Sequence, residues 1–390
     1  MRILKITQSY FPFLDRGGPA VKVRALARGL GGHGHRVTVL TANLGEGQQA
    51  ALGERSRWGW RSEEGNVETV YLRTEFRFRA LTINPALVSF CRERLGQFDV
   101  AHVYGLYDAI GPGAAWLSRR RGIPYVVEPM GMYRPIDRAF FLKGVWHGIL
   151  GRRMIAGACG MIATSELERQ ELVAGGIPAG KVHLRFNPVE LAEFQLLPPR
   201  NTFRDRWRIP RDEPLVLFLS RLIPRKGADL LIEAFAEALP AKGLLAIVGP
   251  EGARGYQEHL RAVAEACGVS GRVRFTGALY GEEKKAALAD ADVFALPSSY
   301  ENFANAAAEA VASGVPALVT DHCGIHSLLE GRAGLVVKRE KGEIARALGT
   351  LIENDELRER LRAGCRGLAE ELSVERSVES LEAIYGECLP

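Results

Sequence analysis

Two glutamates stand eight residues apart in the segment SSYENFANAAAEAVASGVPALV, residues 298–319. Glu301 follows the apolar run DVFALP, which is typical of a buried strand, and a helix is predicted to begin between Asn302 and Asn305. Eight residues of helix span about 12 Å and set two side chains about 80° apart. Because a carboxylate can accept hydrogen bonds from two vicinal hydroxyls, Glu301 and Glu309 could each bind a separate sugar ring. The alternative is a pair of solvated charges on an amphipathic helix.

Two cations occupy another loop that follows a predicted strand. Arg221 comes directly after the apolar run PLVLFLS, and Lys226 comes five residues later, before Gly227. Cations in this position suit two phosphate groups, and they would stabilise the charge of a departing diphosphate. Exposed Arg and Lys are common, so either residue alone would carry little weight. Their joint position favours a phosphate site that needs no metal, because the protein itself supplies the positive charge.

The loop after the first apolar run, RILKIT, contains Gly17 and Gly18 immediately before Pro19, which is typical of the first turn of a helix. Paired glycines let the backbone come close to a ligand, and a helix amino terminus presents N–H groups to an anion. Gly17 and Gly18 are therefore candidates for a diphosphate contact. A plain strand-to-helix turn explains them equally well, because the loop matches neither a dinucleotide fingerprint nor a Walker loop.

Short runs rich in Val, Ile and Leu alternate with helical patterns in both halves of the chain. The first half contains RILKIT, RVTVLTA, VETVYL, DVAHVYG, PYVVE and GMIATS, and the second contains PLVLFLS, GLLAIVG, RVRFTG, DVFALP, PALVT and GLVV. A proline-rich, charged stretch lies between them. This pattern predicts two α/β domains with doubly wound, Rossmann-like sheets, residues 1–196 and 197–370, which face each other across a cleft. Ligands of such sheets bind beyond the carboxyl ends of the strands.

Four stretches of the second half belong together as a set of motifs. They are SRLIPRKGADLLIEAF, AIVGPEG, RVRFTGALYGEEKKAAL and ADVFALPSSYENFANAAAEAVASGVPALVTDHCGIHSLLEGRAGLVV, the last with a Glu, seven residues, Glu signature. Together they resemble the donor-binding core of the retaining glycosyltransferases of family 4 (group 1 glycosyltransferases), which have the GT-B fold. The similarity covers most of residues 214–370, and GGP and TSELE suit the amino-terminal domain of that family.

The resemblance implies a role for each motif residue in binding a nucleotide-sugar donor. Arg221 and Lys226 would hold the diphosphate and Glu301 would meet the donor sugar, so these three are the predicted catalytic residues. The other implied donor contacts are Glu309 to the ribose, the amides of Asn302, Phe303 and Ala304 to the sugar and phosphate, Gly277 and Leu279 near the base, and Gly18 to the diphosphate. In this fold the carboxyl-terminal helix, here residues 371–390, usually crosses back to the first domain.

One position departs from the family pattern. Many relatives carry a His near the donor sugar in a segment that corresponds to VVEPMGMYRP, and Met130 takes that position here. A role for such a His is therefore in doubt, and Glu128 is the nearby polar substitute on the acceptor side. Inverting chemistry would need a positioned base. In retaining enzymes of this type the departing phosphate is expected to take the proton, so the change is compatible with activity.

These features predict a retaining, metal-independent hexosyltransferase that uses no cofactor. It would move a hexose from a nucleotide-diphosphate sugar to a saccharide or lipid-linked acceptor in cell-surface polysaccharide biosynthesis. Two alternatives stay open: a sugar-nucleotide epimerase of the same fold, and a catalytically silent module that binds nucleotide-sugars. An epimerase would isomerise its donor without an acceptor, whereas a silent module would bind nucleotide and turn over nothing.

The charge of the chain is uneven. Residues 1–196 hold 26 Lys and Arg against 17 Asp and Glu, a net charge of +9, while the remainder holds 25 against 29, so the total is +5. A basic first half predicts an anionic partner, such as a phosphorylated lipid or an anionic membrane surface. Nucleic acid is not predicted, because no binding motif accompanies the charge. Residues 134–158, which combine aromatic and basic side chains, fit either an interfacial helix or a core-packed helix.

Composition also bears on the compartment and on metals. No apolar run approaches the roughly 20 residues that cross a bilayer, and no signal peptide is recognised, so a cytoplasmic protein with peripheral contact at the inner membrane face is predicted. The cysteines are predicted to be reduced because they show no paired spacing; they are Cys91, Cys159, Cys267, Cys323, Cys365 and Cys388. The motifs DAD (290–292) and HCGIH (322–326) contain metal-ligand residue types, but no full ligand set accompanies either.

Overall fold

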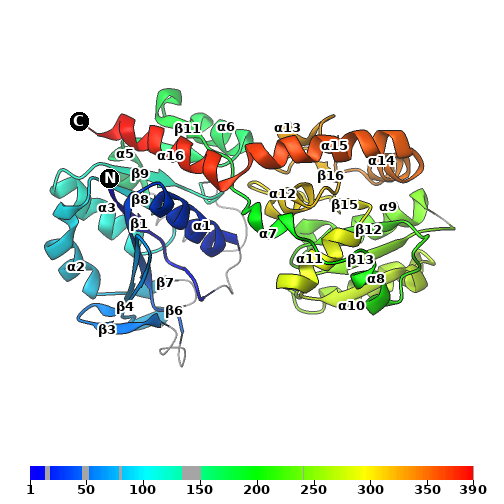
Figure 1. Cartoon of the computed structure of the whole chain (residues 1–390), viewed down its shortest axis with the longest axis horizontal. Coiled ribbons are helices and arrows are strands. Elements are labelled where there is room, and N and C mark those ends of the chain that lie inside the picture. The colour runs from blue at the N-terminus through cyan, green and yellow to red at the C-terminus, as the bar shows by residue number, and fades with distance from the viewer. Residues whose placement is uncertain (14–17, 46–51, 79–80, 134–150, 240, 390) are drawn as a thin grey trace. The chain divides into compact units, whose positions relative to one another are not determined.

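A computed structural model describes residues 1–13, 18–45, 52–78, 81–133, 151–239 and 241–389. The chain divides into two compact units (Figure 1). The first comprises Met1–Pro188 with Val374–Pro390, and the second comprises Val189–Ser373. Both are built on parallel sheets, which confirms the predicted α/β class. The predicted boundary after residue 196 falls inside the second unit.

The sheet of the first unit has nine strands within the described residues, in the order β11-β10-β9-β8-β1-β2-β5-β4-β3. The pairs from β11 to β5 are parallel, whereas β3 and β4 add an antiparallel edge and β6 pairs only with β7. The strands are β1 (Arg2–Ile6), β2 (Arg36–Ala42), β3 (Glu54–Ser56), β4 (Gly59–Glu64), β5 (Val67–Leu72), β6 (Phe76–Phe78), β7 (Leu81–Ile83), β8 (Val100–Tyr104), β9 (Tyr125–Glu128), β10 (Gly160–Ala163) and β11 (Val182–Leu184).

Helices cover both faces of this sheet, and its central strands are accordingly buried on both sides. One hydrophobic cluster joins the sheet to α2, α3, α5 and α6, and another joins it to α1 and α16. The helices are α1 (Gly18–Gly32), α2 (Ala86–Arg94), α3 (Ile110–Arg120), α5 (Arg152–Ala156), α6 (Glu166–Ala174) and α16 (Val374–Cys388), with short 3-10 turns η3 (Leu95–Gln97) and η5 (Ala179–Lys181).

Among its described residues, the second unit has a six-stranded parallel sheet in the order β14-β13-β12-β15-β16-β17. The order reverses between β12 and β15, and in such sheets this switch point is where ligands bind. The strands are β12 (Leu215–Leu219), β13 (Leu244–Val248), β14 (Val273–Gly277), β15 (Val293–Leu296), β16 (Ala317–Thr320) and β17 (Gly334–Val337). The helices are α7 (Ala192–Gln195), α8 (Thr202–Trp207), η6 (Pro224–Lys226), α9 (Ala228–Ala238), α10 (Tyr256–Ala266), η7 (Ser270–Arg272), α11 (Gly281–Asp290), α12 (Asn305–Ala312), α13 (His326–Leu329), α14 (Lys341–Glu353) and α15 (Asp355–Glu371).

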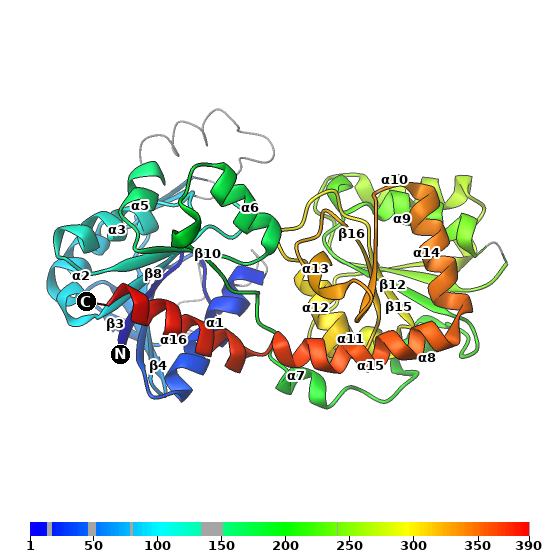
Figure 2. The ribbon, with the colours of Figure 1, turned by 90° about the horizontal axis from the view of Figure 1, so that it is seen from above.

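The last helix, α16, lies beside α1 in the first unit (Figures 1 and 2). A glycine allows this close approach, since a Cβ at Gly29 would lie 2.7 Å from Val378 and 2.8 Å from Val374. Leu381 and Tyr385 of the same helix are fully buried in the core of the unit. The carboxyl-terminal residues are therefore part of the folded core of the first unit.

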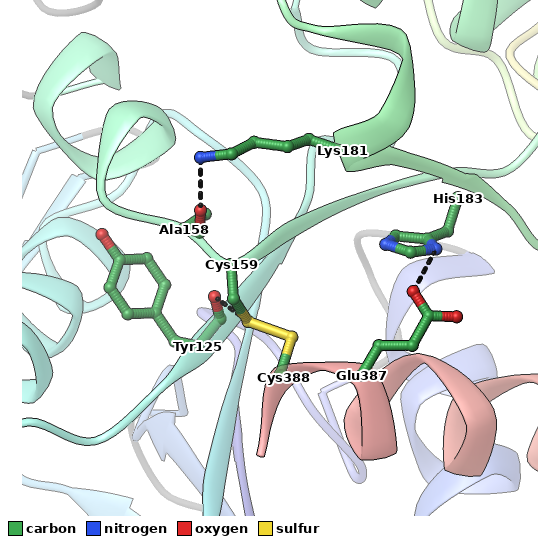
Figure 3. Close-up of a disulfide and its surroundings, with 7 residues drawn as sticks. All are labelled: Tyr125, Ala158, Cys159, Lys181, His183, Glu387 and Cys388. Carbon is green, nitrogen blue, oxygen red and sulfur yellow. Dashed lines mark hydrogen bonds and ion pairs between the residues drawn. A yellow bond between two sulfur atoms is a disulfide. The ribbon is translucent and has the colours of Figure 1, made fainter. Parts of the chain in front are cut away.

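A disulfide joins α16 to the loop before β10 (Figure 3). Cys159 and Cys388 are 229 residues apart in sequence, yet their Cα atoms lie 5.7 Å apart. The prediction that all six cysteines are reduced is therefore wrong for this pair. Sequence spacing could not reveal it, because the two residues meet only after α16 has packed on the first unit. Cys91, Cys323 and Cys365 are buried free thiols.

Replacing Cys388 with serine should destabilise the first unit by about 2–4 kcal/mol, because the disulfide restricts a long loop in the unfolded chain. Denaturant unfolding with and without reductant measures this effect. The reduced wild type should match the variant, whereas replacing the free, half-buried Cys267 with serine should change little. Equal midpoints for oxidised wild type and Cys388→Ser would show that the bond contributes nothing.

Across the residues with described positions, no helix is both long and apolar enough to span a membrane.

Candidate active site

The site of interest lies where the loops after β12 and β15 meet in the second unit. The backbone N–H of Ser299 and the hydroxyl of Ser298 both donate to the carbonyl of Arg225, at 2.9 and 3.0 Å. Gly227 makes the contact possible: its φ is +73°, and a Cβ there would collide with the carbonyl oxygen of Pro297. The two loops are thereby locked against each other at the switch point of the sheet.

This packing brings together two residues that are 75 positions apart in sequence. Nζ of Lys226 donates to Oε1 of Glu301 in an ion pair. The side chain of Lys226 is only 7% exposed and that of Glu301 is 18% exposed. Because ion pairs with so little solvent exposure are screened much less than surface pairs, each of these two charges interacts strongly with a ligand bound beside it. Arg221 is exposed at the carboxyl end of β12, on the same edge of the sheet.

A second set of backbone bonds fixes the position of Glu301. Its N–H donates to the carbonyl of His322 at 3.0 Å, and its carbonyl accepts from Gly324 at 2.9 Å. The HCGIH motif therefore supports the loop that carries Glu301. Cys323 of this motif is buried, and burial together with the charge of Glu301 raises the pKa of its thiol to about 12, so it stays protonated.

The turn into α12 is strained. Ala304 has φ +77°, a left-handed conformation that costs a non-glycine residue about 1–3 kcal/mol and is concentrated at functional sites. Phe303 is buried behind it, and its carbonyl accepts from Ile325 at 2.9 Å. The helix begins at Asn305, so the segment from Glu301 to Ala304 is loop, and regular helical spacing does not describe the distance to Glu309.

Glu309 lies in the second turn of α12 and has a partner on another helix. Nζ of Lys284, in the first turn of α11, donates to Oε1 of Glu309 at 2.9 Å. The two side chains are 24% and 26% exposed. The string GEEKKAAL offers two lysines, and nothing in its spacing shows which one faces α12.

The two residues expected near the base lie at the end of β14 and just after it. Gly277, the last residue of β14, has φ +74°, and its carbonyl accepts from the N–H of Gly249 at 2.8 Å, which ties the loop after β13 to the end of β14. Leu279 is buried and lines a largely apolar cavity of about 170 Å³ between α8 and α11, together with Phe203 and Trp207. The structure thus places Leu279 of the candidate base loop at the wall of this cavity.

In the first unit, Gly18 is the first residue of α1, at the carboxyl side of β1. Gly17 and residues 134–150 of the proposed interfacial segment lie outside the described residues. Met130 has φ +56° and is followed by Gly131 with φ +74°, so the turn after β9 contains two successive left-handed residues. The N–H of Gly131 donates to the buried carboxylate of Glu168, which holds the turn in place.

Glu128 has a different environment from the one expected. It is fully buried at the end of β9, and its two oxygens accept from Lys22 and Arg185. Burial alone would raise the pKa of this carboxyl, but the two cations hold it well below its usual value. Both oxygens are engaged inside the unit, and the side chain is fully buried. Its surroundings make it the counter-ion of a buried network.

Further buried polar groups extend this network to α16. Nζ of Lys5 donates to the hydroxyl of Tyr104 at 2.6 Å, and Tyr385 contacts Nδ1 of His102 at 2.7 Å. Burial lowers the pKa of His102 to about 3 and also lowers the pKa of Lys5, so His102 is neutral near pH 7. Tyr385 thereby links the carboxyl-terminal helix to the strands β1 and β8.

The carboxylates of the DAD motif have structural partners. Asp290 is buried and accepts from the backbone N–H groups of Asn201, Phe203 and Arg204, so it caps the start of α8. Asp292 pairs with the guanidinium groups of Arg204 and Arg362. In the described part of the chain, no group of three His, Cys, Asp or Glu side chains could hold a metal ion.

Comparison with known proteins identifies the family of this chain. A family model described as glycosyl transferases group 1 matches residues 199–366, and one described as a glycosyl transferase 4-like domain matches residues 17–188. The D-inositol 3-phosphate glycosyltransferase of Thermomonospora curvata is 30% identical over 320 residues, which cover 74% of this chain and 72% of that protein. Its counterpart in Xylanimonas cellulosilytica is 29% identical over 310 residues, which cover 75% of this chain and 72% of that protein. The chain belongs to the group 1 glycosyltransferases.

Solved structures show the same fold. Sucrose-phosphate synthase from Thermosynechococcus elongatus aligns with a TM-score of 0.78 at 20% identity, over 99% of this chain and 98% of that one. Anabaena HepE, solved in complex with UDP and glucose, aligns with a TM-score of 0.77 at 19% identity, over 99% of both chains. These neighbours are GT-B glycosyltransferases, so the predicted GT-B fold is confirmed.

Proposed function

We propose that this glycosyltransferase moves a hexose from a nucleotide-diphosphate sugar to an acceptor with retention of anomeric configuration. The observation that carries the proposal is the ion pair of Lys226 and Glu301 at the switch point between β12 and β15. A cation for phosphate and a carboxylate for sugar hydroxyls stand next to each other there. These are the two chemical groups that must be recognised on either side of the bond that breaks.

Each predicted donor residue then has a role. Lys226 and Arg221 bind the diphosphate and stabilise the charge that develops on it as it leaves. Glu301 accepts hydrogen bonds from hydroxyls of the donor sugar, and Glu309 accepts them from the ribose. The amides of the strained turn at residues 302–304 face the sugar and phosphate. The protein supplies the positive charge, so the reaction requires neither metal nor cofactor.

Buried charge supports the assignment of Lys226. The ammonium has little access to water and pairs with the carboxylate of Glu301, so a diphosphate would gain strongly from approaching it. When the diphosphate binds, Lys226 can share its charge between phosphate and Glu301, which leaves the second oxygen of Glu301 for the sugar. Donor sugar and leaving group are thereby recognised together.

For the acceptor we propose a saccharide or a lipid-linked saccharide in cell-surface polysaccharide biosynthesis, bound by the basic amino-terminal half. The curated relatives act, by name, on D-inositol 3-phosphate, so phosphorylated polyols form the competing class of acceptor.

Peripheral contact with an anionic membrane fits the excess of basic residues in the first half of the chain. If the protein contacts the membrane in this way, its co-sedimentation with vesicles should increase with the fraction of anionic lipid. Co-sedimentation that does not depend on the anionic lipid fraction would contradict membrane contact.

The donor reaction is tested with a panel of nucleotide-sugars, beginning with UDP-glucose. The proposal predicts slow donor hydrolysis alone, and faster transfer with retained configuration, read by NMR, when a matching acceptor is added. Isomerisation of the donor without an acceptor would identify an epimerase. Tight nucleotide binding without any turnover across donors and acceptors would identify a silent binding module.

A further inference from the structure

Lys284 makes a contact that separates it from the other charged residues of its helix. The first turn of α11 carries Glu282 and Glu283, and Lys285 pairs back to Glu282 on the same helix at 2.7 Å. Lys284 instead reaches α12, where its Nζ lies 2.9 Å from Oε1 of Glu309. The pair therefore bridges two helices whose amino-terminal ends flank the candidate donor site.

The pair contributes little to stability, since both side chains are about one quarter exposed and such pairs are worth about 0–1 kcal/mol. Its position matters more. Lys284 follows Leu279, the candidate base contact, by five residues, and its Nζ holds the carboxylate expected to meet the ribose. One lysine thus follows the candidate base contact closely in sequence and holds the candidate ribose contact directly.

We infer that Lys284 is a positioning residue for nucleotide recognition: it fixes Oε1 of Glu309 so that Oε2 faces the hydroxyls of the donor ribose. Without this contact, Glu309 would rotate among several rotamers, and binding a ribose would have to order it. With the contact in place, the carboxylate is ordered before the nucleotide arrives. The second oxygen then offers two acceptor positions, which is enough for both ribose hydroxyls.

The other carboxylate of the candidate donor site, Glu301, is held by a lysine in the same way. Glu301 is held through Oε1 by Lys226, and Glu309 is held through Oε1 by Lys284. Both lysines come from a different element than the carboxylate they hold. The difference lies in burial, because Lys226 is almost enclosed whereas Lys284 is accessible. Lys226 therefore suits charge stabilisation, and Lys284 suits orientation.

The inference rests on the proposed function, because it assumes that Glu309 binds the ribose. The test compares the affinities of UDP and 2′,3′-dideoxy-UDP by calorimetry in wild type and in Lys284→Met. Lys285→Met is the matched control, since it removes the neighbouring lysine and an ion pair of similar length. Wild type and control should prefer UDP, and Lys284→Met should reduce that preference about 3- to 10-fold, the usual cost of ordering one side chain on binding.

The outcomes separate the inference from the function on which it rests. In the supporting result, Lys284→Met binds the dideoxy nucleotide like wild type, and in a Glu309→Gln background the Lys284→Met substitution lowers the preference no further. An unchanged preference in Lys284→Met, or a wild type that binds both nucleotides equally, would overturn the inference while leaving the donor site intact. Failure of wild type to bind UDP, GDP or ADP would overturn the proposed function, and the role of Lys284 with it.

Discussion

Replacing Glu301 with glutamine is expected to reduce hexose transfer at least about 100-fold, a loss comparable to removal of one pre-positioned transition-state contact. The carboxamide keeps the size of the side chain but loses the charge and one acceptor oxygen. Lys226 would lose its partner, and the donor hydroxyls would lose their strongest acceptor. Initial-rate measurements with the identified donor and acceptor test this expectation.

Two controls give the result its meaning. Thermal unfolding shows whether the variant retains its fold, since an unpaired Lys226 in a nearly enclosed position can destabilise the second unit. Glu282→Gln removes an exposed carboxylate from α11 and should leave the rate unchanged within about 2-fold. Turnover equal to wild type in a folded Glu301→Gln variant would remove Glu301 from the catalytic site.

Replacing Glu128 with glutamine should destabilise the first unit by about 3–5 kcal/mol, the usual cost of breaking a buried ion pair from one side. Lys22 and Arg185 would then be buried without a counter-charge. Denaturant unfolding measures the loss.

Glu64→Gln is the matched control for this experiment. Glu64 also pairs with two cations, Arg24 and Arg28, but it is more than half exposed, so its loss should cost no more than about 1 kcal/mol. Equal stability of Glu128→Gln and wild type would show that the buried network does not need its carboxylate. Normal stability with a selective rise in acceptor KM would restore Glu128 to the acceptor side.

Local sequence patterns predicted the fold well because the sheets are buried on both faces. Strands such as LVLFL at 215–219 carry no polar interruption, and helical patterns follow each of them, so the parallel α/β class could be inferred from the alternation alone. The return of the carboxyl-terminal helix α16 to the first unit was harder to predict from local patterns. That α16 closes the core of the first unit depends on contacts such as Gly29 with Val378, which pair residues hundreds of positions apart.

The disulfide and the buried surroundings of Glu128 could not be read from the sequence, for the same physical reason. Cys159 meets Cys388 only through the packing of α16, and Glu128 meets Lys22 and Arg185 only when α1, β9 and the segment after β11 have assembled. A charged residue at the end of an apolar strand looks the same in sequence whether it faces solvent or a buried partner. The burial of the side chain distinguishes these two possibilities, and a single sequence does not show whether a given charged side chain is buried.

The candidate donor site was predictable to the extent that its residues follow strands. Arg221, Lys226 and Glu301 each come shortly after an apolar run, and parallel strands place their carboxyl ends on one edge. Lys284 was not predicted, because its partner lies on another helix. The strain at Ala304 was also invisible, since alanine carries no sequence signal for a left-handed backbone.

The proposed function depends above all on the loops after β12 and β15 binding a nucleotide-diphosphate sugar. Calorimetric titration of wild type and Lys226→Met with a panel of nucleotide-sugars, UDP-glucose first, measures this binding. One donor should bind wild type, and its affinity should fall at least about 10-fold in a folded Lys226→Met variant, because a charge-assisted contact to phosphate is lost. Equal affinity in the two proteins, or binding of no donor by wild type, would contradict the assignment of this site.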